Sequence, residues 1–172
     1  ISLQGVCSGE LPQYVAQFNG AGDQILVPFS YTINKISIGV WVKTQGNNEL
    51  IFLLQNNTPL IYFQVGDTTD GGNSNQFVVY LRNNAGTGVI PWNSGISINN
   101  NQWHFLALSW NGAVASLYVD GNNVANTSFS GALTLTGIKG MLGAAGLYSY
   151  SGSMANVQIY NTSLSASEIQ AL

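Results

Sequence analysis

The sequence predicts an all-β protein, and three observations carry this prediction. Short runs of alternating or continuous apolar residues recur along the chain, separated by clusters of Gly, Asn, Asp and Ser. Helical periodicity is confined to the C-terminal end. In residues 103–121, two apolar runs flank Asn111-Gly112, a pair that favours a type I′ hairpin turn, and the second run ends at the turn pair Asp120-Gly121. Such short antiparallel strands indicate a two-sheet sandwich or a barrel.

Strands are expected at residues 13–18, 24–28, 36–43, 50–54, 60–65, 76–82, 103–110, 114–119, 123–129, 138–142 and 153–160. Within residues 36–43, alternate positions share one face, namely Ile36, Ile38, Val40 and Val42. One helix is expected at the end, because Ser165 and Glu168 have capping-box spacing. The longest irregular tracts are residues 66–75 and 93–102, and loops of this length in a compact domain often carry function.

Length and charge limit the classes of protein to consider. The 172 residues suit one domain that buries a full core without a metal or disulfide. Charged residues make up only 6% of the chain, against about 25% in an average soluble domain. The basic residues are scattered, which argues against binding to nucleic acid or anionic membranes: Lys35, Lys43, Arg82 and Lys139.

The start of the chain suggests processing. Residues 1–12 lack the basic region of a signal peptide, no apolar run approaches the roughly 20 residues that span a bilayer, and the first residue is Ile1. We expect residues 1–12 to be the remnant of a leader or linker, and a leader or an N-terminal anchor to have been removed before them. Residues 13–172 are expected to form the domain. Cys7 is the single cysteine, so it is either a free thiol or paired with a missing segment or a second chain.

Two features bear on location. Three sequons, at Asn56, Asn126 and Asn161, favour an extracellular or cell-surface protein. The scarcity of carboxylates and cations predicts tolerance of an acidic environment, because acid denaturation mostly reflects protonation of paired carboxylates and repulsion among the remaining cations. The alternative is that low charge simply belongs to an uncharged extracellular β-protein.

Four segments in order carry a family resemblance: YVAQFNGAGDQILVP, ISIGVWVKT, NNQWHFLALSWNGAVASLYVDGNNVA and GLYSYSGSMANVQIYNTSLSASEIQAL. From Tyr14 to Leu172 the chain resembles the laminin-G-like group of the concanavalin A-like lectin/glucanase superfamily. The resemblance implies a two-sheet antiparallel jelly-roll sandwich with one short C-terminal helix, in which the first and last strands lie side by side. It also implies secretion and a role in binding or adhesion.

The resemblance further implies a structural calcium ion near the junction of the first and last strands. Asn19 and Asp23 match positions where the family usually has acidic residues, and their side chains with nearby carbonyls would supply the oxygen ligands that calcium prefers. Ala155 stands where the family commonly has an acidic residue, so one plausible ligand is missing. The alternative is an Asx turn closed by Asp23 without an ion.

Catalysis is not expected. Retaining glycosidases of this fold place two carboxylates about 5 Å apart with a Glu-x-Asp-x-x-Glu strand, and the seven acidic residues here lack that spacing. His104 is the only histidine, and the family often has His at this position without catalysis. No Gly-x-Ser-x-Gly elbow accompanies it, so we expect His104 to be structural.

Sugar binding is the favoured chemistry, because aromatic faces stack on sugar C–H groups while amides and hydroxyls bond the ring hydroxyls. The candidate aromatic residues are Tyr62, Tyr80, Trp92, Tyr148 and Tyr150, and the candidate polar residues are Asp70, Asn73, Asn75 and Arg82. Tyr80 and Arg82 share one face of their strand. The core is expected to hold Trp41, Trp103 and Trp110, whereas Trp92 follows Pro91 before a loop and is expected to be the most exposed tryptophan.

Two functions from different classes stay open. The first is a noncatalytic glycan-binding or adhesion module of a cell-surface or secreted protein, whose partner is a carbohydrate or a surface glycoprotein. The second is a structural subunit of a surface layer or extracellular filament, whose partners are identical subunits. A glycan-active enzyme is a third and less favoured reading. The resemblance favours the binding module.

Overall fold

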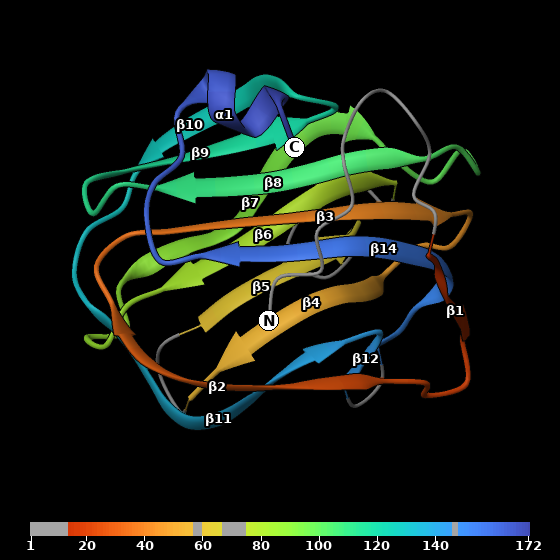
Figure 1. Cartoon of the computed structure of the whole chain (residues 1–172), viewed down its shortest axis with the longest axis horizontal. Helices are drawn as coiled ribbons and strands as arrows, with labels where there is room; N and C mark the ends of the chain where they lie inside the picture. Colours follow the sequence, from red (N-terminus) through yellow and green to blue (C-terminus); the bar gives the residue numbers. More distant parts are fainter. Residues whose placement is uncertain (1–13, 57–59, 67–74, 146–147) are drawn as a thin grey trace.

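Two stacked antiparallel sheets form the protein in the computed structural model, which describes residues 14–56, 60–66, 75–145 and 148–172. The first sheet contains, in spatial order, β1 (Ala16–Asn19), β14 (Ser151–Tyr160), β3 (Ile36–Thr44), β8 (His104–Trp110), β9 (Val114–Val119) and β10 (Asn122–Ser128). The second contains β2 (Ile25–Ile33), β11 (Leu133–Leu142), β4 (Glu49–Gln55), β5 (Leu60–Val65), β6 (Gln76–Arg82) and β7 (Gly88–Ser97). Figure 1 shows β3, β8 and β14 crossing over the strands of the second sheet. The two-sheet antiparallel sandwich is confirmed.

The first and last strands lie side by side, as the resemblance implied. Strand β1 pairs with β14 from Ala16 opposite Met154 to Asn19 opposite Ser151. A short hairpin of β12 (Ala144–Ala145) and β13 (Tyr148–Ser149) precedes β14. The turn after β1 and the start of β14 therefore meet at one end of the sandwich.

The core lies between the two sheets and follows the alternation seen in the sequence. Along β3, Ile36, Ile38, Val40 and Val42 all point inward and are buried. Trp110 is also buried, and its indole N–H donates to the carbonyl of Phe129 at 2.7 Å. The pairing of its only polar atom explains why this large side chain is stable in the core.

The two hairpins that join β8, β9 and β10 are present, but their turns differ. Asp120 and Gly121 have φ angles of 52° and 76°, as a two-residue type I′ turn requires. The expectation of a type I′ turn at Asn111-Gly112 is wrong, because Trp110 pairs with Ala115 and the loop is longer. Asn111 closes this loop with its side chain, whose Oδ1 accepts from the N–H groups of Ala113 and Val114.

Strand β7 is the main element that the sequence pattern did not predict. Part of the tract expected to be irregular, residues 93–97, belongs to it, and only residues 98–102 are irregular. Gly88, Pro91 and Gly95 interrupt the strand pattern in the sequence, and the pairing of β6 with β7 contains two register shifts. The edge position of β7 tolerates these interruptions.

The C-terminal helix α1 (Ala166–Gln170) is present with the predicted capping box. The Ser165 hydroxyl accepts from the Glu168 N–H, and the Glu168 carboxylate accepts from the Ser165 N–H. The preceding segment is held on the first sheet by Ser37 and Ser109, whose hydroxyls donate to the carbonyls of Thr162 and Leu164. This tether places α1 against the outer face of the first sheet, where Ile169 is buried.

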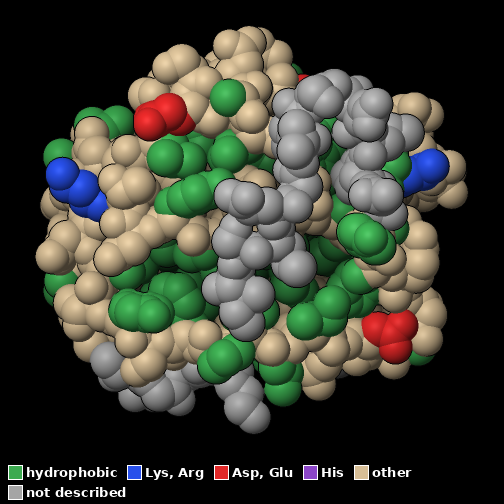
Figure 2. Space-filling model, viewed as in Figure 1, with side chains coloured by type: hydrophobic (Ala, Val, Ile, Leu, Met, Phe, Trp, Pro, Cys, Tyr) green, Lys and Arg blue, Asp and Glu red, His purple; other side chains and the backbone are tan. Residues whose placement is uncertain are grey.

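The surface has few charged groups. Figure 2 shows only isolated blue and red side chains on the viewed face, toward its rim, with hydrophobic side chains between them. Large exposed apolar residues gather near the ends and edges of strands: Tyr14, Val15, Ile25, Leu26, Tyr31, Ile96 and Val114. In the described part of the chain, no helix has the length and apolar character needed to span a membrane.

Candidate ligand-binding site

The outer face of the second sheet carries a group of partly exposed aromatic residues. Along β5, Ile61 and Phe63 point into the core, and along β6, Phe77, Val79 and Leu81 do the same. Because successive side chains in a strand alternate between faces, Tyr62 and Tyr80 point outward. They belong to a separate apolar cluster on this outer face.

The register of the sheet aligns these residues across four strands. Met141 lies opposite Leu53, Leu53 opposite Tyr62, and Tyr62 opposite Tyr80. Tyr148 from β13 joins them, and we call Tyr62, Tyr80 and Tyr148 the tyrosine row. The Tyr62 ring lies 5.2 Å from that of Tyr80 and 6.4 Å from that of Tyr148, in both cases edge to face. These contacts fix the orientation of the rings.

Buried leucines border the tyrosine row on the same face of the sheet. Leu50, Leu53 and Leu60 are buried, whereas Tyr62, Tyr80, Tyr148 and Met141 are each half-buried. The rings therefore pack against buried leucines and still present part of their surface to solvent. A rigid, partly exposed aromatic surface suits the apolar face of a sugar ring, because little conformational entropy is lost on binding.

Polar groups flank the tyrosine row on neighbouring strand positions. Arg82 lies two residues from Tyr80 on the same face and pairs with Leu60 across the strands, as the sequence predicted. Gln64 lies two residues from Tyr62, and its amide donates to the Asn48 Oδ1 at 2.5 Å. The guanidinium and the tyrosine hydroxyls are the groups of this face that suit hydrogen bonds to sugar hydroxyls.

The structure brings together some of the predicted ligand-binding residues and separates others. Tyr62, Tyr80, Tyr148 and Arg82 share the outer face of the second sheet or border it. Asn75 instead lies at the start of β6, where its carbonyl accepts from the Ile98 N–H at 2.8 Å. Asp70 and Asn73 lie outside the described residues.

Two predicted ligand-binding aromatics are buried, and their assignment is wrong. Trp92 is only 9% exposed and pairs with Val79, so it shares the inward face of that core residue. Tyr150 is fully buried, and its hydroxyl donates to the carbonyls of Lys43 and Ser153. Burial raises the pKa of the Tyr150 hydroxyl above its ordinary value. Neither side chain is available to stack on a ligand.

The Asn19–Asp23 turn is closed by its own hydrogen bonds. The Asn19 N–H donates to Asp23 Oδ2 at 2.9 Å, and the Ala21 N–H donates to Asn19 Oδ1 at 2.7 Å. Ala155 is buried on β14 opposite Trp41. The described residues hold no group of three or more His, Cys, Asp or Glu side chains arranged for a metal. Calcium would therefore need most of its six to eight oxygens from carbonyls and water, and its binding stays a prediction.

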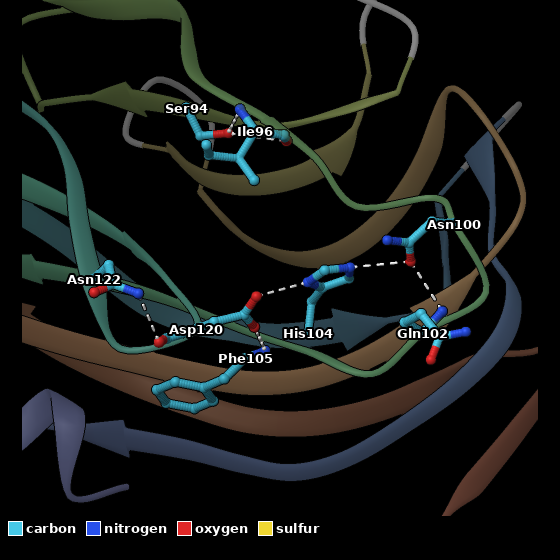
Figure 3. A network of polar contacts seen from close by, with 8 residues as sticks. All are labelled: Ser94, Ile96, Asn100, Gln102, His104, Phe105, Asp120 and Asn122. Carbon is cyan, nitrogen blue, oxygen red and sulfur yellow. Dashed lines mark hydrogen bonds and ion pairs between the residues drawn. The ribbon is translucent and has the colours of Figure 1, made fainter.

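His104 joins two loops (Figure 3). Its Nδ1 lies 2.8 Å from Asp120 Oδ2, and its Nε2 lies 3.0 Å from Asn100 Oδ1. The second Asp120 oxygen accepts from the Phe105 N–H at 2.9 Å. Burial alone would raise the pKa of Asp120, but hydrogen bonds to His104 and Phe105 and the charge of His104 together lower it. The arrangement fits the structural role expected for His104, because it ties the loop before β8 to the β9–β10 turn.

These features define a class: an antiparallel two-sheet sandwich with adjacent terminal strands and an aromatic outer face. The chain belongs to the concanavalin A-like lectin/glucanases superfamily, whose laminin-G-type family model matches residues 19–170. No curated protein matches the sequence.

Several solved structures share the fold. Domain 4 of a GH43 extracellular arabinanase from Geobacillus stearothermophilus, in complex with arabinotriose, is 19% identical with a TM-score of 0.73, covering 92% of this chain and 76% of that chain. A native heptameric SAP-like pentraxin from Limulus polyphemus is 16% identical with a TM-score of 0.67, covering 91% and 79%. A proposed carbohydrate-binding protein from Bacteroides ovatus is 13% identical with a TM-score of 0.74, and this chain spans 47% of its length. Identities this low show a common fold alone.

Proposed function

We propose that this domain is a noncatalytic glycan-binding module of a secreted or cell-surface protein, and that the tyrosine row is its binding surface. The observation that carries the proposal is the gathering of three half-buried tyrosine rings beside buried leucines on one sheet face. Stacking of sugar C–H groups on such rings needs no charge, which suits a chain with 6% charged residues. Arg82, on the same face, would add hydrogen bonds to the sugar hydroxyls.

Membership of a superfamily of lectins and glucanases supports a carbohydrate ligand. One protein of similar fold is bound to arabinotriose and another is described as a proposed carbohydrate-binding protein. A shared fold does not fix a shared ligand, so the tyrosine row carries the proposal and the relatives support it.

The placement of the carboxylates supports a noncatalytic role. In the described part of the chain, Asp23, Glu49, Asp120 and Glu168 lie in a turn, beneath the β3–β4 connection, in the β9–β10 hairpin and in α1. Each is engaged in local hydrogen bonds. A glycosidase would need two carboxylates on either side of a bound sugar.

The test is a glycan array followed by calorimetry with the best neutral or acidic oligosaccharide, arabino-oligosaccharides included. Tyr62→Ala and Tyr80→Ala should each weaken binding about tenfold or more, equivalent to about 1.4 kcal/mol, because each removes a stacking ring. Tyr80→Phe keeps the ring and should retain most of the affinity. Tyr31→Ala is the matched control, since Tyr31 is exposed on β2, at the edge of the second sheet. The proposal is wrong if no glycan binds, or if the row variants bind like the control.

A second candidate function is a subunit of a surface layer or filament. It is favoured by exposed apolar residues on β2, an edge strand of the second sheet, namely Ile25, Leu26 and Tyr31. Such residues on an unpaired edge suit contact with a second copy of the chain. Sedimentation at micromolar concentration separates the candidates, because a subunit should self-associate while a lectin-like module stays monomeric and binds saccharides.

We also propose that the Asn19–Asp23 turn binds a structural calcium ion weakly. The turn places the Asp23 carboxylate and the Asn19 side-chain oxygen at the junction of β1 and β14. At a calcium concentration ten times the dissociation constant, the expected stabilisation is about 1.4 kcal/mol. The measurement is Tm with calcium and with chelator, for the natural chain and Asp23→Asn. If neither calcium nor chelator changes the Tm, the proposal that this turn binds calcium is wrong.

A further inference from the structure

Glu49 is a buried carboxyl group whose neighbours are hydroxyl and amide groups. It is the first residue of β4, and the residue is 5% exposed. Its Oε2 lies 2.7 Å from Thr44 Oγ1, and its Oε1 accepts from the Ser151 N–H at 3.0 Å. The glycine at position 46 is needed here, because a Cβ on Gly46 would overlap the carboxyl group. A buried carboxylate without a cation is costly, so the protonation state of Glu49 requires a physical explanation.

Counting protons around the Thr44 hydroxyl answers this question. Thr44 Oγ1 lies 2.7 Å from Glu49 Oε2 and 2.8 Å from the Ser151 carbonyl oxygen. A hydroxyl has one proton to donate, and a carbonyl has none. If Glu49 were ionised, Thr44 would therefore face two acceptors with a single proton, which the contacts of 2.7 and 2.8 Å would have to share.

If Glu49 Oε2 carries a proton, each of these polar groups has a hydrogen-bond partner. Glu49 then donates to Thr44 Oγ1, Thr44 donates to the Ser151 carbonyl, and the Ser151 N–H donates to Glu49 Oε1. The Gly46 N–H donates to the remaining lone pair of Thr44 Oγ1 at 2.9 Å. The ring of hydrogen bonds is closed only when the carboxyl group is neutral.

The surroundings favour the same state. Burial raises the pKa of Glu49, and the hydrogen bonds to Thr44 and Ser151 only partly oppose that effect. Among the residues that the structure describes, two titratable residues lie beside it on the elements packed around it. Tyr150 precedes Ser151 and donates its hydroxyl proton away, to the carbonyls of Lys43 and Ser153. Lys43 precedes Thr44 on β3 with its side chain on the other face from the buried Val42.

We propose that Glu49 is a neutral carboxylic acid in the folded protein and that its proton closes a clasp between the β3–β4 connection and the first residue of β14. Ionisation at higher pH opens this clasp. The opening reaches further elements, because Ser151 pairs with Asn19 at the end of β1, and the Asn101 N–H donates to the Thr44 carbonyl. The fold is thus strengthened in acid at the place where β1, β3, β4 and β14 meet.

The sign of the pH dependence follows from this arrangement. The folded state holds the Glu49 proton more tightly than the unfolded chain does, so its stabilisation is complete below the ordinary glutamate value, about 4.3. That stabilisation is lost as the pH rises through the higher folded-state value. The clasp therefore gives a specific mechanism for the tolerance of acid that the low charge of the sequence suggests.

The test uses Glu49→Gln, whose amide imitates the protonated acid. Its Oε1 can accept from Ser151 and its Nε2 can donate to Thr44, so the ring stays closed at every pH. From about pH 4 to pH 8, the Tm of the natural chain should fall by about 2–4 °C or more relative to the variant. Groups that titrate in both proteins cancel in this difference. Glu168→Gln, at the exposed helix cap, is the matched control and should not reproduce the effect.

A direct measurement keeps the proposal testable if the variant does not fold. The carboxyl carbon of Glu49, followed by NMR in the natural chain, should keep the chemical shift of a protonated acid well above pH 4.3, the ordinary glutamate value. Titration of Glu49 at or below that value would overturn the proposal. Parallel Tm profiles for the natural chain and Glu49→Gln would overturn it as well.

Discussion

The two outer faces of the sandwich both carry apolar clusters, but only one cluster is closed by the chain's own helix. On the first sheet, Phe105, Ala107 and Tyr118 are buried together with Ile169 of α1. On the second sheet, buried leucines lie beside side chains that are only half-buried: Tyr62, Tyr80, Tyr148 and Met141. An apolar outer face is therefore not by itself a sign of binding. The sign is aromatic surface that the described elements leave accessible.

Truncation of the residue that closes the first face should give the largest effect on stability. Ile169 is fully buried, and Ile169→Ala should lower the free energy of unfolding by about 2–5 kcal/mol through lost burial and a cavity. Glycan affinity should not change at temperatures where the variant is folded. Urea unfolding and calorimetry measure the two quantities. If the folded variant loses glycan affinity, the distinction between the two faces is wrong, because the closed face would then take part in binding.

Truncation on the second face should give the reverse pattern. Tyr62 is the central ring of the tyrosine row, so Tyr62→Ala should weaken glycan binding by about 1.4 kcal/mol or more, equivalent to about tenfold. Its cost in stability should be smaller than that of Ile169→Ala, because Tyr62 is only half-buried. The same two measurements apply. Equal affinity for Tyr62→Ala and Tyr31→Ala would show that the accessible rings do not bind the ligand.

The sequence predicted local features better than the placement of single side chains. Asp120-Gly121 and the Ser165–Glu168 pair specify a turn and a helix start through chemistry within a few residues, and both are present. Trp92 was expected to be exposed because Pro91 and a loop border it. Its burial depends on pairing with Val79 of another strand, which has no local signal in the sequence.

The tyrosine row also could not be predicted from the sequence, because its assembly depends on the pairing of distant strands. Residue type alone identified Tyr62, Tyr80, Tyr148 and Tyr150 as candidate ligand-binding residues. The register that aligns Tyr62 with Tyr80, and the fully buried position of Tyr150 before β14, separate the first three from the last. The buried leucines beside the row were also missed, because Leu53 and Leu60 look like ordinary core residues until the sheet is assembled.

Weakening the helix cap is a milder way to open the first face. The Ser165 hydroxyl accepts from the Glu168 N–H, so Ser165→Ala should cost about 1 kcal/mol of stability. Thermal unfolding measures this loss. The matched control is Gln170→Ala, which changes an exposed polar residue at the other end of the same helix. Equal losses for the two variants would mean that the cap does not hold α1 on the first sheet.

Protonation of Glu168 should produce the smallest effect, and again on the first face alone. Hydrogen bonds from the Ser165 side chain and backbone lower the pKa of Glu168, so its carboxylate stabilises the helix start above the ordinary glutamate value. That contribution is lost as the pH falls through the lowered value. Amide exchange, corrected for intrinsic rates, should show the Ile169 N–H losing protection in acid while that of Phe63 on β5 keeps it. Glu168→Gln should remove this pH dependence. Uniform loss of protection at both amides would mean that acid acts on the whole sandwich, and the two faces would then not differ in how they are closed.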